Sequence, residues 1–228
     1  FRSIADVVPL HGENRIFVKL GLPLVSRTQN KGLQALLETA RINGKILKPY
    51  HAGFIIGPRI NAAGRMDSAR RALDLLLSTD ESEAMRLAQE LEAVNVQRQQ
   101  LQRKIVQEAM DMIARDVDLD SQRVIVLAKE GWHKGVLGIV ASRVVETFYR
   151  PAVVASIDNG WGTGSARSIE GFHLYEALAY CGDSLKEFGG HRLAAGLMVH
   201  QDHLPRFREL INAYRSEEHT SELQSRQS

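Results

Sequence analysis

The spacing of apolar residues divides the chain into three regions with different predicted structures. In the first region, up to Ser78, a strand-like apolar run covers Ser3 to Leu10, and helical spacing follows near Gly32 to Ile42 and from Ala69 to Leu77. Glycine and proline punctuate the stretches between these elements. The region therefore predicts parts of a fold and not a complete fold of its own.

The second region predicts one long helix. The Asp80 side chain is suited to cap its first N–H groups, and Glu83 stands where it would complete a capping box. The apolar positions with heptad-like spacing are Leu87, Leu91, Val94, Leu101 and Ile105. Arg98 interrupts this seam, and a Gln-Arg-rich stretch covers 97–100. A seam this thin favours a connector between two lobes, with a surface helix on a single core as the alternative.

The third region alternates β-branched runs with helical spacing. Residues 123–127 and 151–155 predict buried strands, and residues 136–148 between them predict a helix. This order is typical of a βαβ unit with a right-handed crossover. We therefore expect an α/β lobe here.

Composition narrows the classes of protein. The chain has 228 residues, of which 44% are hydrophobic and 25% charged, enough for one domain or two small ones. Its single cysteine, Cys181, excludes an internal disulfide framework and a cysteine-rich zinc site and favours the cytoplasm. No apolar stretch approaches the roughly 20 residues of a membrane span, so we expect no membrane partner. With a net charge of only +2, a nucleic-acid surface must be a local concentration of Arg and Lys.

Both ends of the chain look cut. It starts at Phe1, without a methionine, in what resembles the middle of a domain. From Arg215 onward the sequence shows neither helical nor strand period, and it resembles the translation of a common sequencing adapter. We therefore expect residues 215–228 to be a non-native tail.

The run from Phe188 to Gly196 carries the first candidate chemistry. Gly189 and Gly190 would let the backbone approach an anion, and His191 supplies a donor beside it. A turn before a helix is the alternative interpretation.

Two further clusters lie in the first region. Asp6 sits inside an apolar run, where an unpaired carboxylate is costly, so a metal or a cation is one explanation. A capping or turn aspartate is the alternative, and one carboxylate alone does not establish a metal site. Residues 57–65 predict a small-residue loop whose Arg59 and Arg65 suit anion binding. Solvated arginines on a surface loop are the alternative.

Two more clusters lie in the third region. Ser165 and Arg167 follow a Gly-rich turn and would share one phosphate, although an ordinary polar loop is the alternative. Trp132 and His133 stand between a strand end and a helix start, where free N–H groups favour anions. Trp132 suits either base stacking or a lobe interface, and His133 suits either a ligand or a structural donor.

Four segments together resemble the RecJ-type single-stranded-DNA exonucleases of the DHH phosphoesterase superfamily. They are SIADVVPL with the following ENR, GPRINAAGRM, WHKGVLGIVASR and FGGHRLAAG. Together these segments span most of Phe1 to Tyr214, and their order is far more specific than any one motif.

The resemblance implies roles for single residues. Asp6 matches a metal-binding aspartate that helps to hold two Mn²⁺ or Mg²⁺ ions. The positions that match substrate-phosphate contacts are Arg59, Ser165, Arg167, Gly189, Gly190 and His191, with Arg65, Trp132 and His133 as further candidates. The family motif SGR reads SAR here, and Ala166 in place of glycine is expected to restrict the backbone.

The implied fold is α/β with two lobes. Residues 1–78 would be the C-terminal part of a DHH catalytic domain, 79–120 a long connecting helix, and 121–214 a DHH-associated substrate-binding domain. The implied activity is 5'-3' hydrolysis of single-stranded DNA in repair and recombination, with most metal ligands upstream of Asp6, so that this chain alone is expected to be inactive. The alternatives are another DHH phosphodiesterase, acting on oligonucleotides or cyclic dinucleotides, and a non-catalytic nucleic-acid-binding relative.

Overall fold

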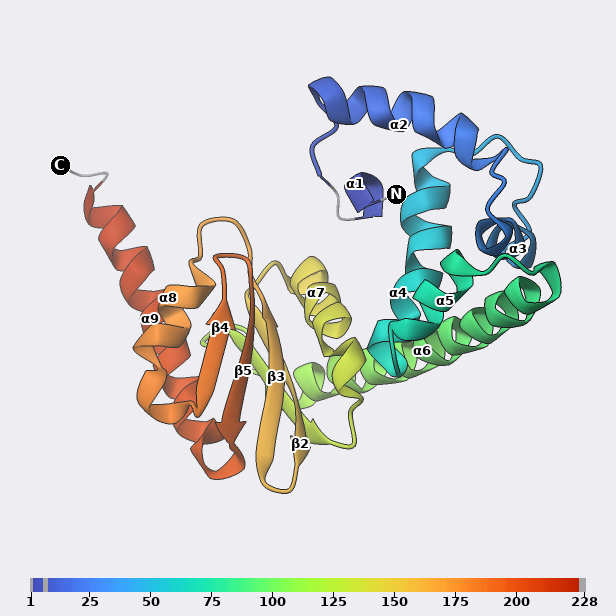
Figure 1. Cartoon of the computed structure of the whole chain (residues 1–228). Helices are drawn as coiled ribbons and strands as arrows, with labels where there is room; N and C mark the ends of the chain where they lie inside the picture. Colours follow the sequence, from blue (N-terminus) through green and yellow to red (C-terminus); the bar gives the residue numbers. More distant parts are fainter. Residues whose placement is uncertain (1, 6–7, 226–228) are drawn as a thin grey trace. The chain divides into compact units, whose positions relative to one another are not determined.

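The computed structural model describes the backbone of residues 2–5 and 8–225, in two compact units (Figure 1). Unit 1 covers Phe1–Gln100 and unit 2 covers Leu101–Ser228. Asp6, the predicted metal ligand, lies outside the described residues. Each unit is described by itself below.

Unit 1 is helical throughout its described part. Its elements are α1 (Arg2–Ala5), α2 (Gly12–Val25), α3 (Lys31–Thr39), a π-helical turn (His51–Ile56), α4 (Gly57–Met66), α5 (Arg70–Leu77) and the first part of α6 (Glu81–Asp116). The predicted helices near 32–42 and 69–77 are confirmed as α3 and α5. The strand-like start is wrong, because residues 2–5 are helical and Ile4 packs beside Gly53 of the π-helical turn. Tertiary packing here overrides the β propensity of a short apolar run.

The predicted loop at 57–65 is also wrong, because these residues form α4. The π-helical turn leads directly into this helix, and Pro58 stands in the first turn of α4. Ala62 and Ala63 are buried, and Ala63 belongs to the core of unit 1. Small residues that suggest a loop in the sequence therefore serve close helix packing.

Helices α3 and α5 are tied together at their ends. The Asn30 side chain accepts a hydrogen bond from the Leu33 N–H at 2.8 Å, which caps α3, and it donates to the Leu76 carbonyl oxygen at 2.8 Å. Gly32, in the first turn of α3, is buried against the backbone of α5. At this point the backbones of α3 and α5 approach each other too closely for a side chain at position 32.

The long helix is confirmed as α6. Asp80 Oδ1 accepts from the Glu83 N–H at 2.8 Å, but the Glu83 carboxylate binds Arg86 and does not close a capping box. Residues of α6 enter the core of unit 1 at Leu87 and Leu91, and Ile105 is buried in the unit 2 part. The predicted seam therefore serves buried positions in both units.

Unit 2 is built on a five-stranded sheet (Figure 1). Its elements after α6 are β1 (Ile125–Glu130), a 3₁₀ turn (Lys134–Val136), α7 (Leu137–Phe148), β2 (Ala152–Asp158), β3 (Trp161–Arg167), α8 (Leu174–Tyr180), a 3₁₀ turn (Gly182–Ser184), β4 (Glu187–Gly190), β5 (Ala194–His200), a 3₁₀ turn (Gln201–His203) and α9 (Leu204–Ser225). The strand order is β1-β2-β3-β5-β4, and only β1 and β2 pair in parallel. The predicted strand-helix-strand unit is confirmed as β1-α7-β2.

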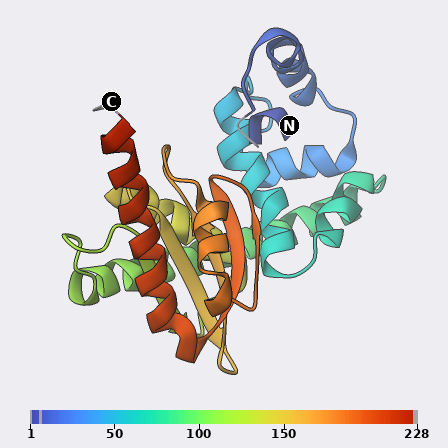
Figure 2. The same ribbon diagram turned by 90° about the vertical axis from the view of Figure 1, so that its left-hand side faces the viewer.

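Helices cover the sheet unequally. Helices α8 and α9 lie on one face, seen in front of the sheet in Figure 2, and cover a core that includes Phe172 and Phe207. Cys181 is a free thiol in this core, and burial raises its pKa to about 12. On the opposite face α7 packs against β2 and β3. Beyond α7 on that face, Gly196 of β5 and Gly189 of β4 are exposed.

Helix α9 continues through Ser225, although the sequence from Arg215 onward shows no helical period. The non-native origin of residues 215–228 stays a prediction. The residues from 215 to 225 include no glycine or proline that would stop a helix. None of the helices in residues 2–5 and 8–225 combines the length and hydropathy that crossing a bilayer requires.

Replacing Gly32 with alanine should destabilise unit 1. A Cβ at this position would lie 2.6 Å from the Leu75 carbonyl carbon, inside van der Waals contact with backbone that cannot move cheaply. We expect a loss of about 1–3 kcal/mol of unfolding free energy, as for other overpacked sites. The measurement is urea unfolding followed by circular dichroism.

Gly21→Ala in α2 is the matched control, because no atom lies within 4 Å of its added methyl group. This change should leave stability equal or raise it by up to ~1 kcal/mol, since alanine favours helix. Equal effects of the two substitutions would contradict the role of Gly32.

Candidate functional site

Three strands of unit 2 place the predicted glycine and serine residues in one row. Ser165 of β3 pairs with Gly196 of β5, and Gly196 pairs with Gly189 of β4. Residues paired across strands point to the same face of a sheet, here the face that α7 leaves open beyond β3. Two of the three positions carry no side chain, so the row forms a bare backbone floor with Ser165 at one end.

Arg167 stands on the same face as Ser165, two residues along β3. Its Nη1 donates to Ser165 Oγ at 3.0 Å and to its neighbour's carbonyl oxygen, that of Ala166, at 2.8 Å. Ala166 itself points the other way and is fully buried in the core. The expected restriction from alanine is therefore wrong, because the extended backbone of a strand suits alanine as well as glycine. The serine and arginine sit on a strand and not on a loop.

Gly138, near the N-terminus of α7, makes room for this pair. A Cβ on Gly138 would lie 2.7 Å from Arg167 Nη2 and 3.1 Å from Ser165 Oγ. The first turn of α7 thus lies directly against the serine and the arginine. The Leu137 N–H is bonded to the Lys134 carbonyl oxygen of the preceding 3₁₀ turn, but the helix dipole still favours an anion at such an end. A guanidinium, a hydroxyl and a helix N-terminus converge here, and this convergence is the candidate phosphate site.

The glycine-bracketed histidine forms a hairpin turn between β4 and β5, so the alternative of a turn before a helix is wrong. The His191 N–H donates to the Ala194 carbonyl oxygen at 2.9 Å, which closes the turn. His191 is exposed, and its Nδ1 accepts from the Leu193 N–H at 3.4 Å. With Nδ1 accepting, the neutral ring carries its proton on Nε2 and offers it outward. Gly190, with φ of +150°, holds a conformation that favours glycine.

A hollow of about 340 Å³ opens over the bare floor. Its lining includes Gly189 and Gly196, with Thr163 and Met198 farther along the strands. Gly138 and Gly196, which lie inside segments that carry the family resemblance, were not assigned a role from sequence. What could have pointed to them is that each is a glycine inside a segment that carries candidate residues.

Arg59 lies in unit 1, on α4, and is engaged by protein groups. Its Nε lies 2.5 Å from Glu92 Oε2 of α6, and its Nη1 donates to the Ile55 carbonyl oxygen at 2.7 Å. The Arg59 side chain is only 16% exposed. Its predicted part in phosphate binding would therefore require exchange of this ion pair.

Arg65 and Arg98 form a second cationic feature of unit 1. Arg65 is exposed on α4, whereas Arg98 is 8% exposed on α6 and donates to Asn95 Oδ1 at 2.9 Å. Burial, and then the neighbouring Arg65 charge, lower the pKa of Arg98. The arginine that interrupts the predicted seam is thus a buried cation beside another cation.

Trp132 and His133 have structural partners. Trp132 is 4% exposed, and its Nε1 donates to Glu108 Oε2 of α6 at 2.8 Å. Hydrogen bonds from Lys129 and then Trp132 lower the pKa of Glu108. His133 Nδ1 accepts from the Gly135 N–H at 3.1 Å and caps the 3₁₀ turn before α7. Both residues position the loop that leads to the α7 N-terminus.

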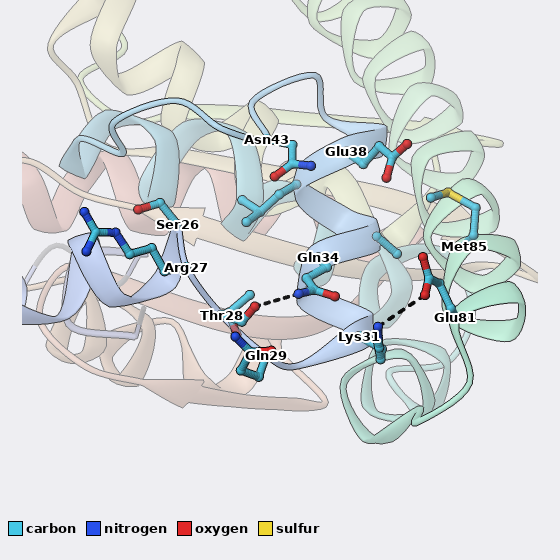
Figure 3. A pocket seen from close by; sticks show the side chains of 12 residues that line it. Ser26, Arg27, Thr28, Gln29, Lys31, Gln34, Glu38, Asn43, Glu81 and Met85 are labelled. Atoms are coloured by element: carbon cyan, nitrogen blue, oxygen red, sulfur yellow. Dashed lines mark hydrogen bonds and ion pairs between the residues drawn. The ribbon is translucent and has the colours of Figure 1, made fainter.

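Unit 1 has a separate hollow of about 420 Å³ beside α3 (Figure 3). Lys31 and Glu81 form an ion pair across its rim at 3.2 Å, and Gln34 Nε2 donates to the Thr28 carbonyl oxygen at 2.7 Å. Its lining mixes cations with carboxylates and contains none of the predicted site residues. The charge balance makes it a poorer anion site than the face of unit 2.

The described residues do not provide a metal centre. Within residues 2–5 and 8–225, no three or more His, Cys, Asp or Glu side chains are grouped so that they could hold a metal ion. The predicted ligand, Asp6, lies outside this part of the chain.

Comparisons with known proteins match both units. Residues 121–217 match the DHHA1 domain family. The chain is 44% identical over 212 residues to the single-stranded-DNA-specific exonuclease RecJ of Bacillus subtilis, covering 92% of this chain and 27% of that protein. It is 39% identical over 227 residues to the Escherichia coli RecJ, covering 93% of this chain and 39% of that protein.

Comparison with solved structures also finds RecJ proteins. A crystal structure of Thermus thermophilus RecJ with Mg²⁺ superposes with a TM-score of 0.85 at 37% identity, over 94% of this chain and 33% of that one. A structure of the same organism's RecJ with Mn²⁺ gives a TM-score of 0.84. The chain thus spans roughly a third of the length of the relatives it matches.

The two glycines of the hairpin should respond differently to alanine. A Cβ on Gly190 would lie 2.5 Å from the Ala195 Cα in a backbone conformation that alanine avoids, so Gly190→Ala should destabilise unit 2 by about 1–3 kcal/mol. A Cβ on Gly189 meets no atom within 4 Å, so Gly189→Ala should change stability by less than about 1 kcal/mol. Thermal unfolding of the two variants checks this difference, and a large loss at Gly189 would contradict the open floor.

Proposed function

This chain belongs to the RecJ-type family of DHH proteins, and we propose that it forms the substrate-holding part of a metal-dependent exonuclease that degrades single-stranded DNA from 5' to 3' in DNA repair and recombination. The observation that carries the proposal is the convergence of Arg167, Ser165 and the α7 N-terminus beside a bare glycine floor. Each of these groups stabilises a phosphate, and the floor lets a nucleic-acid strand approach the backbone.

The chain's own residues would hold and orient the substrate. Arg167 donates to a phosphate oxygen, the Ser165 hydroxyl turns toward the same group, and His191 offers its Nε2 proton from the hairpin turn. Gly189 and Gly190 keep this approach free of side chains. The arrangement would fix the position of one phosphodiester, which reduces the entropic cost of reaction.

Metal ions, Mn²⁺ or Mg²⁺, would supply the activated water and stabilise charge on the scissile phosphodiester. Two structures of one relative, named for its Mg²⁺ and Mn²⁺ complexes, support this choice of metals. Asp6 is the proposed ligand in this chain, with the remaining ligands outside the described residues. Arg59 and Arg65 are proposed to assist the strand from unit 1.

Two other proposals receive less support. A phosphodiesterase for oligonucleotides or cyclic dinucleotides would share the glycine-histidine hairpin, but the relatives at 37–44% identity over most of the chain are named for single-stranded DNA. A non-catalytic nucleic-acid-binding relative would bind DNA equally and would not hydrolyse it in full-length form with metal. We propose the cytoplasm as its compartment, since the single cysteine is an unpaired buried thiol.

Arg167→Ala should weaken binding of single-stranded DNA. Removing one charge-assisted phosphate contact is expected to raise Kd by about tenfold or more and to reduce the slope of log K against log salt by about 1. Fluorescence anisotropy with a 5'-phosphorylated oligothymidylate, over a series of salt concentrations, measures both.

Two variants make this test specific. Gly138→Ala keeps every charge but displaces the Arg167 guanidinium, so it should weaken binding in the same direction. Arg206→Ala removes an exposed arginine from α9, on the opposite face of the sheet, and should leave Kd within about twofold. Unchanged affinity and slope in Arg167→Ala would refute the proposed phosphate site.

The chain by itself should bind DNA without degrading it. Because the described residues contain no metal cluster, addition of Mn²⁺ or Mg²⁺ should give no release of nucleotides from labelled single-stranded DNA. Gel analysis of the products checks this. Degradation by the chain that disappears in Asp6→Ala would show that it holds a complete metal site, contrary to expectation.

A further inference from the structure

The open face of the sheet extends well beyond the phosphate site. Side chains alternate along a strand, so Trp161, Thr163, Ser165 and Arg167 of β3 share one face. Their register partners on β5 are His200, Met198, Gly196 and Ala194. We call these eight positions the strip. It begins at Arg167 and ends at Trp161.

Trp161 is held in place and still exposed. Trp161 is the first residue of β3 and follows the β2-β3 turn directly. In this turn Gly160 has φ of +79° and lies close to the His200 ring. The His200 ring stands edge-on to Trp161 at 4.9 Å between centroids, and Lys186 Nζ lies 4.8 Å from the indole centroid. Trp161 nevertheless remains 37% exposed, in contrast to Trp132 at 4%. An indole that is oriented by neighbours and partly open is suited to stacking.

The distance from the phosphate site suits a short piece of single strand. Six residues of β-strand cover about 20 Å at ~3.4 Å per residue. At a rise of ~3.4 Å per stacked nucleotide, and more when the strand is stretched, this is about three to six nucleotides.

Between the two ends lies the bare floor and its hollow of about 340 Å³. Glu187, paired with Met198, is exposed beside this floor and disfavours a phosphate there. Bases and not phosphates are therefore the better fit to the middle of the strip. Cations stand at its two ends, as Arg167 and Lys186.

We propose that the strip guides single-stranded DNA away from the phosphate site and that Trp161 stacks on an unpaired base a few nucleotides along. The inference rests on the proposed function, because the strand is positioned by the phosphate held at Arg167. Lys186 holds the indole in place and lies near the next phosphate. Stacking on Trp161 is tolerant of sequence, since every base has a flat aromatic face.

The length of the DNA separates stacking from phosphate binding. Kd is measured by anisotropy for 5'-phosphorylated oligothymidylates of 2 and 12 nucleotides. Trp161→Ala should raise Kd for the 12-mer by about tenfold and leave Kd for the dinucleotide unchanged, because the dinucleotide is too short to reach. Trp161→Phe should keep most of the affinity. Tyr180→Ala, which removes an exposed aromatic ring from α8 on the opposite face, is the control.

Tryptophan fluorescence gives a second, direct readout. The chain has two tryptophans, and a stacked base quenches only the accessible one. The 12-mer should quench the fluorescence of the wild-type chain and the dinucleotide should not, and Trp161→Phe should abolish the quenching. Thermal unfolding of each variant establishes that it is folded.

The outcomes distinguish the inference from the function on which it rests. If Arg167→Ala weakens binding of both oligonucleotides, while Trp161→Ala weakens neither and the 12-mer does not quench, the strip is overturned and the phosphate site stands. If Arg167→Ala changes nothing, the proposed function fails first. Equal loss of dinucleotide and 12-mer binding in Trp161→Ala would assign Trp161 a structural role and overturn the inference as well.

Discussion

The close approach of α7 to β3, possible only because Gly138 has no side chain, is the constraint on which the candidate site depends. A methyl group there would occupy the space of the Arg167 guanidinium. With glycine, the first turn of α7 packs directly against the guanidinium and the Ser165 hydroxyl, and these two groups hydrogen-bond to each other. The helix N-terminus and the arginine both attract negative charge, so they can stabilise the same anion. The close packing of α7 on β3 and the favourable electrostatics of the site therefore both depend on glycine at position 138.

Sheet register extends this site into a surface. Gly189 and Gly196 are far apart from Ser165 in sequence, and antiparallel pairing alone brings the three into one row. The register depends on the tight turn at His191, which in turn depends on the conformation of Gly190. Because a slip of one residue would turn every side chain to the other face, the bare floor and the exposed Trp161 are fixed together.

Long periodic segments were predictable from the sequence, and glycine-rich ones were not. The helices α3, α5 and α6 and the unit β1-α7-β2 follow from apolar spacing that agrees with their packing. A loop was expected for residues 57–65 and was the alternative for Ser165 and Arg167, because glycine, serine and arginine show no clear hydrophobic period. The first segment is helix α4, and the two residues lie in strand β3. Likewise Glu92 as the partner of Arg59, and Gly138 as the neighbour of Arg167, are set by tertiary contacts that no local pattern contains. The candidate residues themselves were recognised from motifs, while their geometry required the fold.

The buried thiol of Cys181 has a practical consequence. At a pKa of about 12 almost no thiolate exists near neutral pH, and the core of unit 2 shields the sulfur from reagents. Since the chain has no other cysteine, a cysteine introduced at any exposed position would be its sole reactive thiol. Fluorophores, spin labels or crosslinkers can thus be attached at chosen positions without first removing a native residue. A pair of introduced cysteines, one in each unit, would allow the distance between the two units to be measured.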